Sequence, residues 1–221
     1  MAKKKHQSER RKQQRRRAAS PPRAAKERRT GRERREATVE ERSFLTDIQE
    51  IRRRARQHIQ DGAVTQGYLA DREKVISVLN EALATEIVCV LRYKRHYYMA
   101  TGIHANAVAQ EFLEHANEEQ GHADSIAERI TQLGGEPDFS PEGLATRSHS
   151  QYVEGKSLVD MIREDLIAER IAIESYGEIV RFLGDRDITS RRLMESILAV
   201  EEEHADDMKD LLATFDPNKA G

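Results

Sequence analysis

Apolar positions recur at intervals of three and four residues along four stretches of the chain. These stretches are 70–100, 103–133, 158–183 and 187–214. This spacing places the apolar side chains on one face of an α-helix and leaves the other positions to solvent. Asp71 is a suitable N-cap for the first stretch, and the second ends at Leu133-Gly134-Gly135-Glu136-Pro137, a strong helix-stop signal. The sequence therefore predicts four long amphipathic helices.

Residues 136–157 separate the second stretch from the third and show little periodicity. They contain Pro141, Gly143 and Gly155, which are typical of connecting segments. We expect a long crossover connection here and a short turn at Gly184-Asp185 before the fourth stretch. The predicted fold is an all-α four-helix bundle of up-down-down-up topology with one long crossover.

A shorter apolar pattern precedes the bundle. Ile48, Ile51, Ala55 and Ile59 follow Phe44 or Leu45 at helical spacing, which predicts a short amphipathic helix near 40–60 that ends at Asp61-Gly62. Residues 1–37 are a basic, low-complexity arm with almost nothing apolar to bury. We expect this arm to be disordered.

Charge divides the chain in the same place. Of the 37 Lys/Arg and 39 Asp/Glu residues, positions 1–60 hold 21 and eight, which leaves 16 and 31 for positions 61–221. We therefore expect a basic N-terminal extension, 1–60, and an acidic bundle domain, 61–221. The extension favours salt-sensitive, non-specific contact with DNA phosphates, with a solvated tail as the alternative. The basic runs contain no interleaved aromatic residues to stack on single-stranded bases.

Composition adds two exclusions. The single cysteine, Cys89, excludes an intrachain disulfide framework. The sequence shows neither a signal-peptide pattern nor an apolar run long enough for a membrane span. We expect a reducing, cytoplasmic setting.

Six potential metal ligands lie within the apolar stripes of the four predicted helices. They are Glu86 on the first, Glu119 and His122 on the second, Glu169 on the third, and Glu201 and His204 on the fourth. The two halves repeat one pattern, because 33 residues separate Glu86 from Glu119 and 32 separate Glu169 from Glu201. Residues three apart share a helix face, so each Glu-x-x-His can present both side chains to one metal centre.

A single Glu-x-x-His means little, because such residues commonly form surface ion pairs. A Glu on an apolar stripe, however, costs several kcal/mol unless it is paired or coordinated, and this pattern occurs twice. Four carboxylates can neutralise two divalent cations, and oxygen ligands with imidazole suit iron, manganese or zinc. A Glu from each of two helices and Glu-x-x-His from the other two is the di-iron carboxylate arrangement.

Over 70–214 the chain resembles the bacterioferritins of the ferritin-like superfamily. The motifs that carry the resemblance are Leu79-Asn80-Glu81-Ala82-Leu83-Ala84-Thr85-Glu86, Glu119-Gln120-Gly121-His122, Leu133-Gly134-Gly135-Glu136-Pro137, Asp165-Leu166-Ile167-Ala168-Glu169 and Glu201-Glu202-Glu203-His204. The resemblance implies terminal ligands on each of two irons: Glu86 with His122, and Glu169 with His204. It implies that Glu119 and Glu201 bridge them.

Tyr93 matches the tyrosine that the family keeps beside its diiron centre. The resemblance implies an electron-donating role for Tyr93, with a core aromatic as the alternative interpretation. The implied activity is oxidation of Fe(II) by O2 or hydrogen peroxide, for iron storage or detoxification, in a homo-oligomer: a cage of 12 or 24 subunits, or a dimer.

The chain departs from the family at two points. Gln120 occupies the position of the haem-ligating methionine, and because an amide is a poor haem ligand we expect no haem. Only 17 residues follow His204, which argues against the fifth helix of a 24-subunit shell. A basic arm before such a bundle is similar to the DNA-protecting mini-ferritins, which form 12-subunit shells.

Two other functions remain open from the sequence. One is a nucleoid-associated DNA-binding protein in which the bundle is a scaffold. The other is a dimanganese or diiron enzyme with peroxidase- or catalase-like chemistry. The histidines in the arm, at helix ends and in loops are expected to be exposed: His6, His58, His104 and His149.

Overall fold

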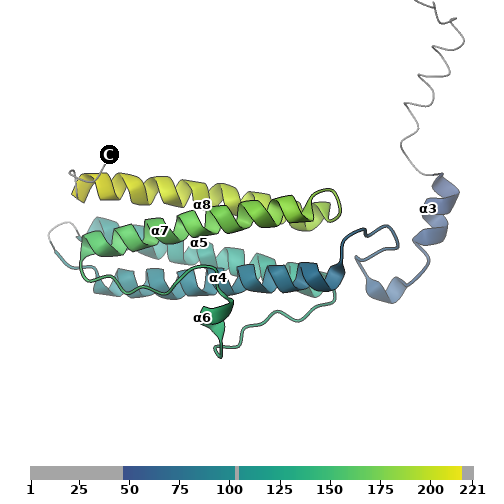
Figure 1. The fold of residues 1–221 in the computed structure, drawn as a ribbon, viewed down its shortest axis with the longest axis horizontal. Coiled ribbons are helices and arrows are strands. Elements are labelled where there is room, and N and C mark those ends of the chain that lie inside the picture. Colours follow the sequence, from purple (N-terminus) through teal and green to yellow (C-terminus); the bar gives the residue numbers. More distant parts are fainter. Residues whose placement is uncertain (1–46, 103–104, 216–221) are drawn as a thin grey trace, which may run out of the picture. The chain divides into compact units, whose positions relative to one another are not determined.

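The computed structural model describes residues 47–102 and 105–215, and every regular element in these ranges is helical (Figure 1). The chain divides after Ile48 into two units, and the bundle lies in the second. The long helices are α4 (Arg72–Met99), α5 (Ala105–Gln132), α7 (Leu158–Leu183) and α8 (Ile188–Phe215). Each begins and ends within two residues of a predicted stretch, so the all-α prediction is confirmed.

The helices form two antiparallel hairpins. α4 packs mainly against α5 and α7 mainly against α8, while α4 also contacts α7 and α5 contacts α8. The crossover returns to the end of the bundle where α5 began, so α7 starts there and the topology is up-down-down-up (Figure 1). The crossover carries one element that the sequence did not predict, α6 (Leu144–Arg147), which contacts α4.

Local sequence explains where the helices begin and end. The Asp71 carboxylate accepts a hydrogen bond from the Lys74 amide at 3.2 Å, which is the predicted N-cap. After α5, Gly134 has a φ of +77°, a conformation that favours glycine. A Cβ on Gly135 would lie 2.8 Å from the Ile76 side chain of α4. The paired glycines therefore serve both the turn and its close packing on α4.

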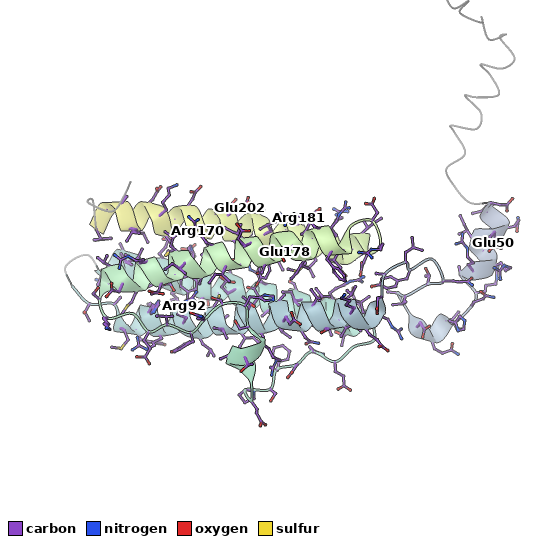
Figure 2. All side chains as sticks on the ribbon, in the orientation of Figure 1. Glu50, Arg92, Arg170, Glu178, Arg181 and Glu202 are labelled. Atoms are coloured by element: carbon purple, nitrogen blue, oxygen red, sulfur yellow. The ribbon has the colours of Figure 1, made fainter. Side chains whose placement is uncertain are left out.

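The outer faces of α7 and α8 are largely polar, as the periodicity predicts, although Ile167 and Ile188 are exposed. Arg170, Glu178 and Arg181 on α7 and Glu202 on α8 are exposed (Figure 2). The helices are thus amphipathic, with their apolar stripes turned toward one another.

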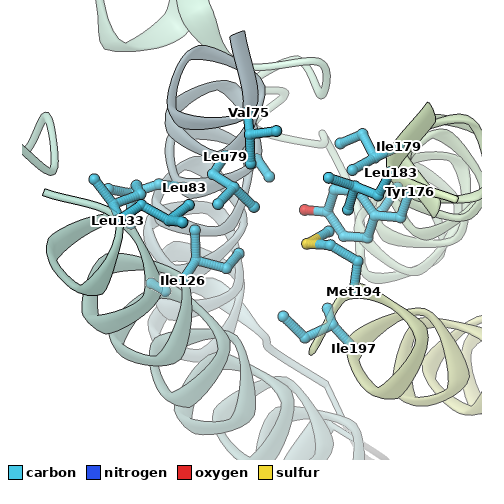
Figure 3. Packing of buried hydrophobic residues seen from close by; sticks show 14 residues of the cluster. Val75, Leu79, Leu83, Ile126, Leu133, Tyr176, Ile179, Leu183, Met194 and Ile197 are labelled. Carbon is cyan, nitrogen blue, oxygen red and sulfur yellow. The ribbon is translucent and has the colours of Figure 1, made fainter. Parts of the chain in front are cut away.

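The apolar core is divided into two clusters along the bundle. One draws on all four long helices and includes Leu79, Ile126, Tyr176 and Met194 (Figure 3). The other includes Tyr93, Phe112, Ile162 and Met208. On every helix the predicted ligand lies between the residues of the first cluster and those of the second. The core therefore leaves a polar layer near the middle of the bundle.

The helix predicted near 40–60 is shorter than expected. α3 (Ile48–Arg54) ends well before Asp61, and a separate 3₁₀ turn, η1 (Ile59–Asp61), follows. Ile48 and Ile51 are 53% and 38% exposed, so α3 lacks the packed apolar face that stabilises most short helices. The predicted disordered arm, 1–37, lies outside the described residues, as do Phe44 and Leu45. No helix within 47–102 and 105–215 is long and apolar enough to cross a membrane.

Candidate metal centre

The six predicted ligands meet in the polar layer between the two core clusters. They form two groups, Glu86–Glu119–His122–Glu201 and Glu119–Glu169–Glu201–His204, in which the ligand atoms lie within 4.8 Å of one another. The two groups share Glu119 and Glu201. The structure therefore brings together all six side chains that the sequence singled out, in the pairing expected of a two-metal site with two bridges.

Burial makes this layer costly without a cation. The four carboxylate residues are at most 1% exposed. Ten buried side-chain N and O atoms in the described ranges lack a hydrogen-bond partner, and seven of them belong to these six residues. They are Glu86 Oε2, Glu119 Oε1, His122 Nδ1, Glu169 Oε2, both Glu201 oxygens and His204 Nδ1. Buried polar atoms are normally satisfied, so seven that converge on one layer fit a site for metal ions.

Each imidazole presents Nδ1 to the carboxylates. His122 Nδ1 lies 3.0 Å from Glu201 Oε1 and 3.4 Å from Glu86 Oε2. His204 Nδ1 lies 3.5 Å from Glu119 Oε1 and 3.7 Å from Glu201 Oε2. The donor set is therefore four carboxylates and two Nδ1 atoms, which suits iron or manganese.

Protons carry the balancing charge in the metal-free protein. Burial raises the pKa of Glu86 well above its usual value, and the charges of Glu119 and Glu201 raise it further. Burial alone would lower the pKa of both histidines, but contact with Glu119, Glu201 and other carboxylates raises it to about 12 for His122 and about 11 for His204. Bound metal would displace these protons, because ligands bind in their deprotonated forms.

Two buried tyrosines orient the outer carboxylates. The Tyr93 hydroxyl donates to Glu169 Oε1, and the Tyr176 hydroxyl donates to Glu86 Oε1. In each case the carboxylate oxygen without a partner is the other one. Tyr93 lies beside the cluster, as predicted. Tyr176 was not predicted, although it follows Glu169 by the seven residues that separate Tyr93 from Glu86.

Two further polar neighbours were not predicted. Glu118 Oε2 lies 2.7 Å from His204 Nε2 and accepts a hydrogen bond from it, so that Nδ1 is the nitrogen that faces the cluster. Such carboxylate–histidine pairs commonly orient metal ligands. His115 is buried and stacks on His204 with ring centroids 3.9 Å apart. Its position one turn before Glu119, inside the apolar stripe, is the signal that could have revealed it.

The remaining predictions for histidines and haem concern residues away from the cluster. His58 is exposed as expected, whereas His149 is only 27% exposed and contacts Thr85 Oγ1, so that prediction was wrong. His6 and His104 lie outside the described residues. Gln120 is exposed on α5 and donates to Asp124 Oδ1 at 3.0 Å.

Residues 76–217 match the family model of the ferritin-like domain. The chain belongs to the ferritin-like family. It is 32% identical to a bacterioferritin of Desulfovibrio desulfuricans over 140 residues, which cover 62% of this chain and 74% of that protein. It is also 33% identical to a nutrient stress-induced DNA-binding protein of Nostoc over 140 residues, or 61% of this chain and 75% of the relative.

Solved structures of ferritin-like proteins share the fold. The dodecameric thioferritin of Bacteroides fragilis has a TM-score of 0.65 and 34% identity over 70% of this chain and 92% of its own. The D. desulfuricans bacterioferritin, described with a diiron site, has a TM-score of 0.59 and 29% identity over 67% and 83%. The Rhodobacter capsulatus bacterioferritin, described with a dinuclear site and haem iron, has a TM-score of 0.59 and 28% identity over 67% and 88%.

Proposed function

We propose that this ferritin-like protein is a ferroxidase that oxidises Fe(II) to Fe(III) at a diiron centre within one subunit. Glu86 and His122 are the terminal ligands on one side, and Glu169 and His204 are those on the other. Glu119 and Glu201 bridge the two positions. The observation that carries the proposal is the convergence of seven buried atoms without a hydrogen bond in two groups that share these two carboxylates.

The charge of the site fits a pair of ferrous ions. Four carboxylates with neutral imidazoles supply four negative charges, which match two Fe(II) ions. Bound iron supplies the electrons for reduction of O2 or hydrogen peroxide. Glu118 holds the tautomer of His204, and Tyr93 and Tyr176 each fix one oxygen of a terminal carboxylate. The protein's own contribution is therefore a preformed, largely buried ligand set.

Iron storage or detoxification in a homo-oligomer is the wider role that we propose. The relatives named bacterioferritin and the dodecameric B. fragilis protein support it. The absence of haem remains a prediction from Gln120, since a bacterioferritin of similar fold is described with haem iron. Absorbance at the Soret wavelength after addition of haem to the purified protein tests that prediction.

Adjacent carboxylates on α8 provide a matched test of the ferroxidase. Glu201 is buried in the cluster, whereas Glu202 is exposed (Figure 2). Glu201→Ala should abolish rapid Fe(II) oxidation, measured by stopped-flow absorbance, and Glu202→Ala should retain it. Circular dichroism should show both variants folded. Rapid oxidation at the wild-type rate in Glu201→Ala would refute the assignment of Glu201 as a bridge.

DNA binding is a second candidate function, located in residues 1–60. Two observations support it. The extension holds 21 basic residues against eight acidic ones, and the chain is 33% identical to a Nostoc protein named for DNA binding. A dimanganese or diiron enzyme with peroxidase- or catalase-like chemistry remains the alternative for the bundle. Metal analysis of the purified protein, with Fe(II) oxidation and peroxide consumption measured side by side, distinguishes the two chemistries.

A further inference from the structure

A second group of potential ligands lies beside the six-residue cluster. It consists of Glu111 and His115 on α5 and Asp207 on α8, with ligand atoms within 4.8 Å of one another. His115 Nε2 lies 3.5 Å from Glu111 Oε1 and 3.6 Å from Asp207 Oδ2. Both distances exceed the usual 2.7–3.2 Å of an N–H···O hydrogen bond. The imidazole thus faces two carboxylates without forming a normal hydrogen bond to either.

Hydrogen bonding determines which nitrogen of His115 faces this group. Tyr93 has one hydroxyl proton, which it donates to Glu169. The contact of 3.2 Å between His115 Nδ1 and the Tyr93 oxygen therefore needs a proton on Nδ1. In a neutral ring this leaves the Nε2 lone pair toward Glu111 and Asp207. The His115 side chain is 2% exposed, and its unprotonated Nε2 points toward the two carboxylates.

Packing holds the ring in this orientation. One face stacks on His204, and the ring meets Tyr93 edge-on with centroids 5.3 Å apart. Negative charges crowd around Glu111: burial raises its pKa, the charges of Asp207, Glu114 and Glu118 raise it further, and His204 lowers it. A cation between the three side chains would relieve this crowding.

Solvent reaches the group through an acidic pocket. The pocket has a volume of about 240 Å³ and is lined by Glu111, Asp207, Asp210, Leu211 and Thr214. The Asp207 and Asp210 side chains are 54% and 80% exposed. A hydrated cation can therefore approach from solvent, while the buried imidazole lies at the inner end of the group.

We propose that Glu111, His115 and Asp207 form a third metal site, which takes a divalent transition-metal ion. One imidazole and two carboxylates, with water at the remaining positions, suit Fe(II), Mn(II), Co(II) or Zn(II). The part of this proposal that rests on the proposed ferroxidase is that Fe(II) is the cation and that it passes from the acidic pocket to the diiron centre. The stack of His115 on His204 makes the two sites neighbours.

The third site can be tested without iron chemistry. Crystals of the wild-type chain equilibrated with Co(II) should show an anomalous peak between His115 Nε2 and the two carboxylates, separate from peaks among the six central ligands. That peak should disappear in Asp207→Asn and persist in Asp206→Asn, whose exposed carboxylate pairs with Lys209. A map without density at this position, or an undiminished peak in Asp207→Asn, would overturn the proposal.

Solution titration gives a second readout. In the Glu119→Ala/Glu201→Ala protein the central site is disabled, and we expect one Co(II) bound per chain. Adding Asp207→Asn should weaken this binding about tenfold or more, whereas adding Asp206→Asn should not. Equal affinity in both would refute the site even if Fe(II) oxidation by the wild type were confirmed. Conversely, Co(II) binding here would stand if the ferroxidase proposal failed.

The transfer role has its own test in the otherwise wild-type chain. Asp207→Asn should slow Fe(II) oxidation at limiting iron and leave the two-iron stoichiometry of the rapid phase unchanged. An unchanged rate at limiting iron would exclude transfer through this site.

Discussion

Tyr93 and Tyr176 make the same contact on opposite sides of the centre, but their surroundings differ. Each donates a hydrogen bond to a cluster carboxylate on the facing helix. Tyr176 belongs to the apolar cluster that includes Met194 and Ile197, whereas Tyr93 also has His115 Nδ1 at 3.2 Å. The apparent two-fold symmetry of the site therefore ends at the tyrosines, and only Tyr93 has a second hydrogen-bonding partner.

This asymmetry predicts different outcomes for two phenylalanine variants. Tyr93→Phe and Tyr176→Phe each remove the donor that orients a carboxylate, so both should weaken metal binding about tenfold or more. Only Tyr93 should lose an electron during turnover, because Glu169 can accept its proton and the His115 Nδ1–H can donate a hydrogen bond to the oxidised oxygen. Electron paramagnetic resonance of rapidly frozen samples should show a tyrosyl signal in Tyr176→Phe and none in Tyr93→Phe. A signal that survives in Tyr93→Phe contradicts this role.

The metal-free site also predicts a dependence of stability on pH. The folded-state pKa values of His122 and His204, about 12 and 11, lie above the ordinary value of 6.5. The folded protein binds more protons than the unfolded chain between these limits, so stability falls as pH rises. The stabilisation is complete below about pH 6.5 and is lost as pH rises through the folded values. Glu86, with its raised pKa, acts in the same direction.

Thermal unfolding of the metal-free protein tests this sign. The melting temperature should fall between pH 7 and pH 10, and His122→Gln should make the fall shallower. His149→Gln, at a partly exposed position outside the cluster, is the matched control and should follow the wild type. A wild-type melting temperature that rises over this range would contradict the assignment.

Several partners of the site could not be predicted at the residue scale. The six proposed ligands could be singled out because their spacing repeats, and repetition is visible in one sequence. Glu118, His115 and Tyr176 act through contacts that depend on how facing helices are rotated against each other, which periodicity does not specify. The repeated seven-residue interval from Glu to Tyr was nevertheless present in the sequence and went unused.

At the scale of elements, a buried ionic network joins α4, α7 and the crossover. Arg92 Nε lies 2.8 Å from Asp165 Oδ1, and His96 Nδ1 lies 2.8 Å from Asp165 Oδ2. Arg92 also donates to Ser150 Oγ and the Gln151 carbonyl. Asp165 lies one turn before Glu169, so this network fixes α7 close to the point where it contributes to the centre.

Breaking this network should therefore be costly. Arg92→Met leaves Asp165 buried without its main counter-charge, which should lower the free energy of unfolding by about 3–5 kcal/mol. Arg95→Ala removes an ion pair to Glu154 that is partly exposed and should cost less than about 1 kcal/mol. Urea unfolding of the metal-free proteins compares the two variants. Equal losses of unfolding free energy in the two variants would contradict the expectation that the buried Arg92 ion pair matters more for stability than the partly exposed Arg95 pair.

Helix positions were predictable and connections less so. Apolar periodicity, the Asp71 cap and the glycine pair after α5 are local signals, which explains the agreement at the helix ends. The four-residue α6 has no apolar period of its own. The apolar pattern of α3 continues past Arg54, but no residue of α3 is buried. The helix therefore ends early, because no packed face stabilises a longer one.

At the scale of the whole molecule, the opposite charges of the two predicted parts indicate separate functions: DNA contact for the extension and metal binding for the bundle. Residues 61–221 have 31 acidic against 16 basic residues and would repel DNA, so any binding to a duplex must use residues 1–60. If several extensions project from one oligomer, weak contacts reinforce one another through effective concentration. The logarithm of the affinity should fall linearly with the logarithm of the salt concentration, at a slope of about −0.9 per neutralised phosphate.

Removal of residues 1–60 tests this separation of functions directly. A gel shift at two salt concentrations should show retardation of duplex DNA by the 1–221 chain and none by the 61–221 chain. Fe(II) oxidation should be equal in both, because every proposed ligand lies after residue 85. Equal retardation by both forms, or by neither, would reject a DNA role for the extension.

The central claim is that six side chains from four helices hold two metal ions in one subunit. Anomalous diffraction at the iron edge, on crystals loaded anaerobically with Fe(II), measures this most directly. We predict two peaks in the central cluster of each chain, one beside His122 Nδ1 and one beside His204 Nδ1, with Glu119 and Glu201 reaching both. A single central peak, or iron bound only outside the six-residue cluster, would contradict the account.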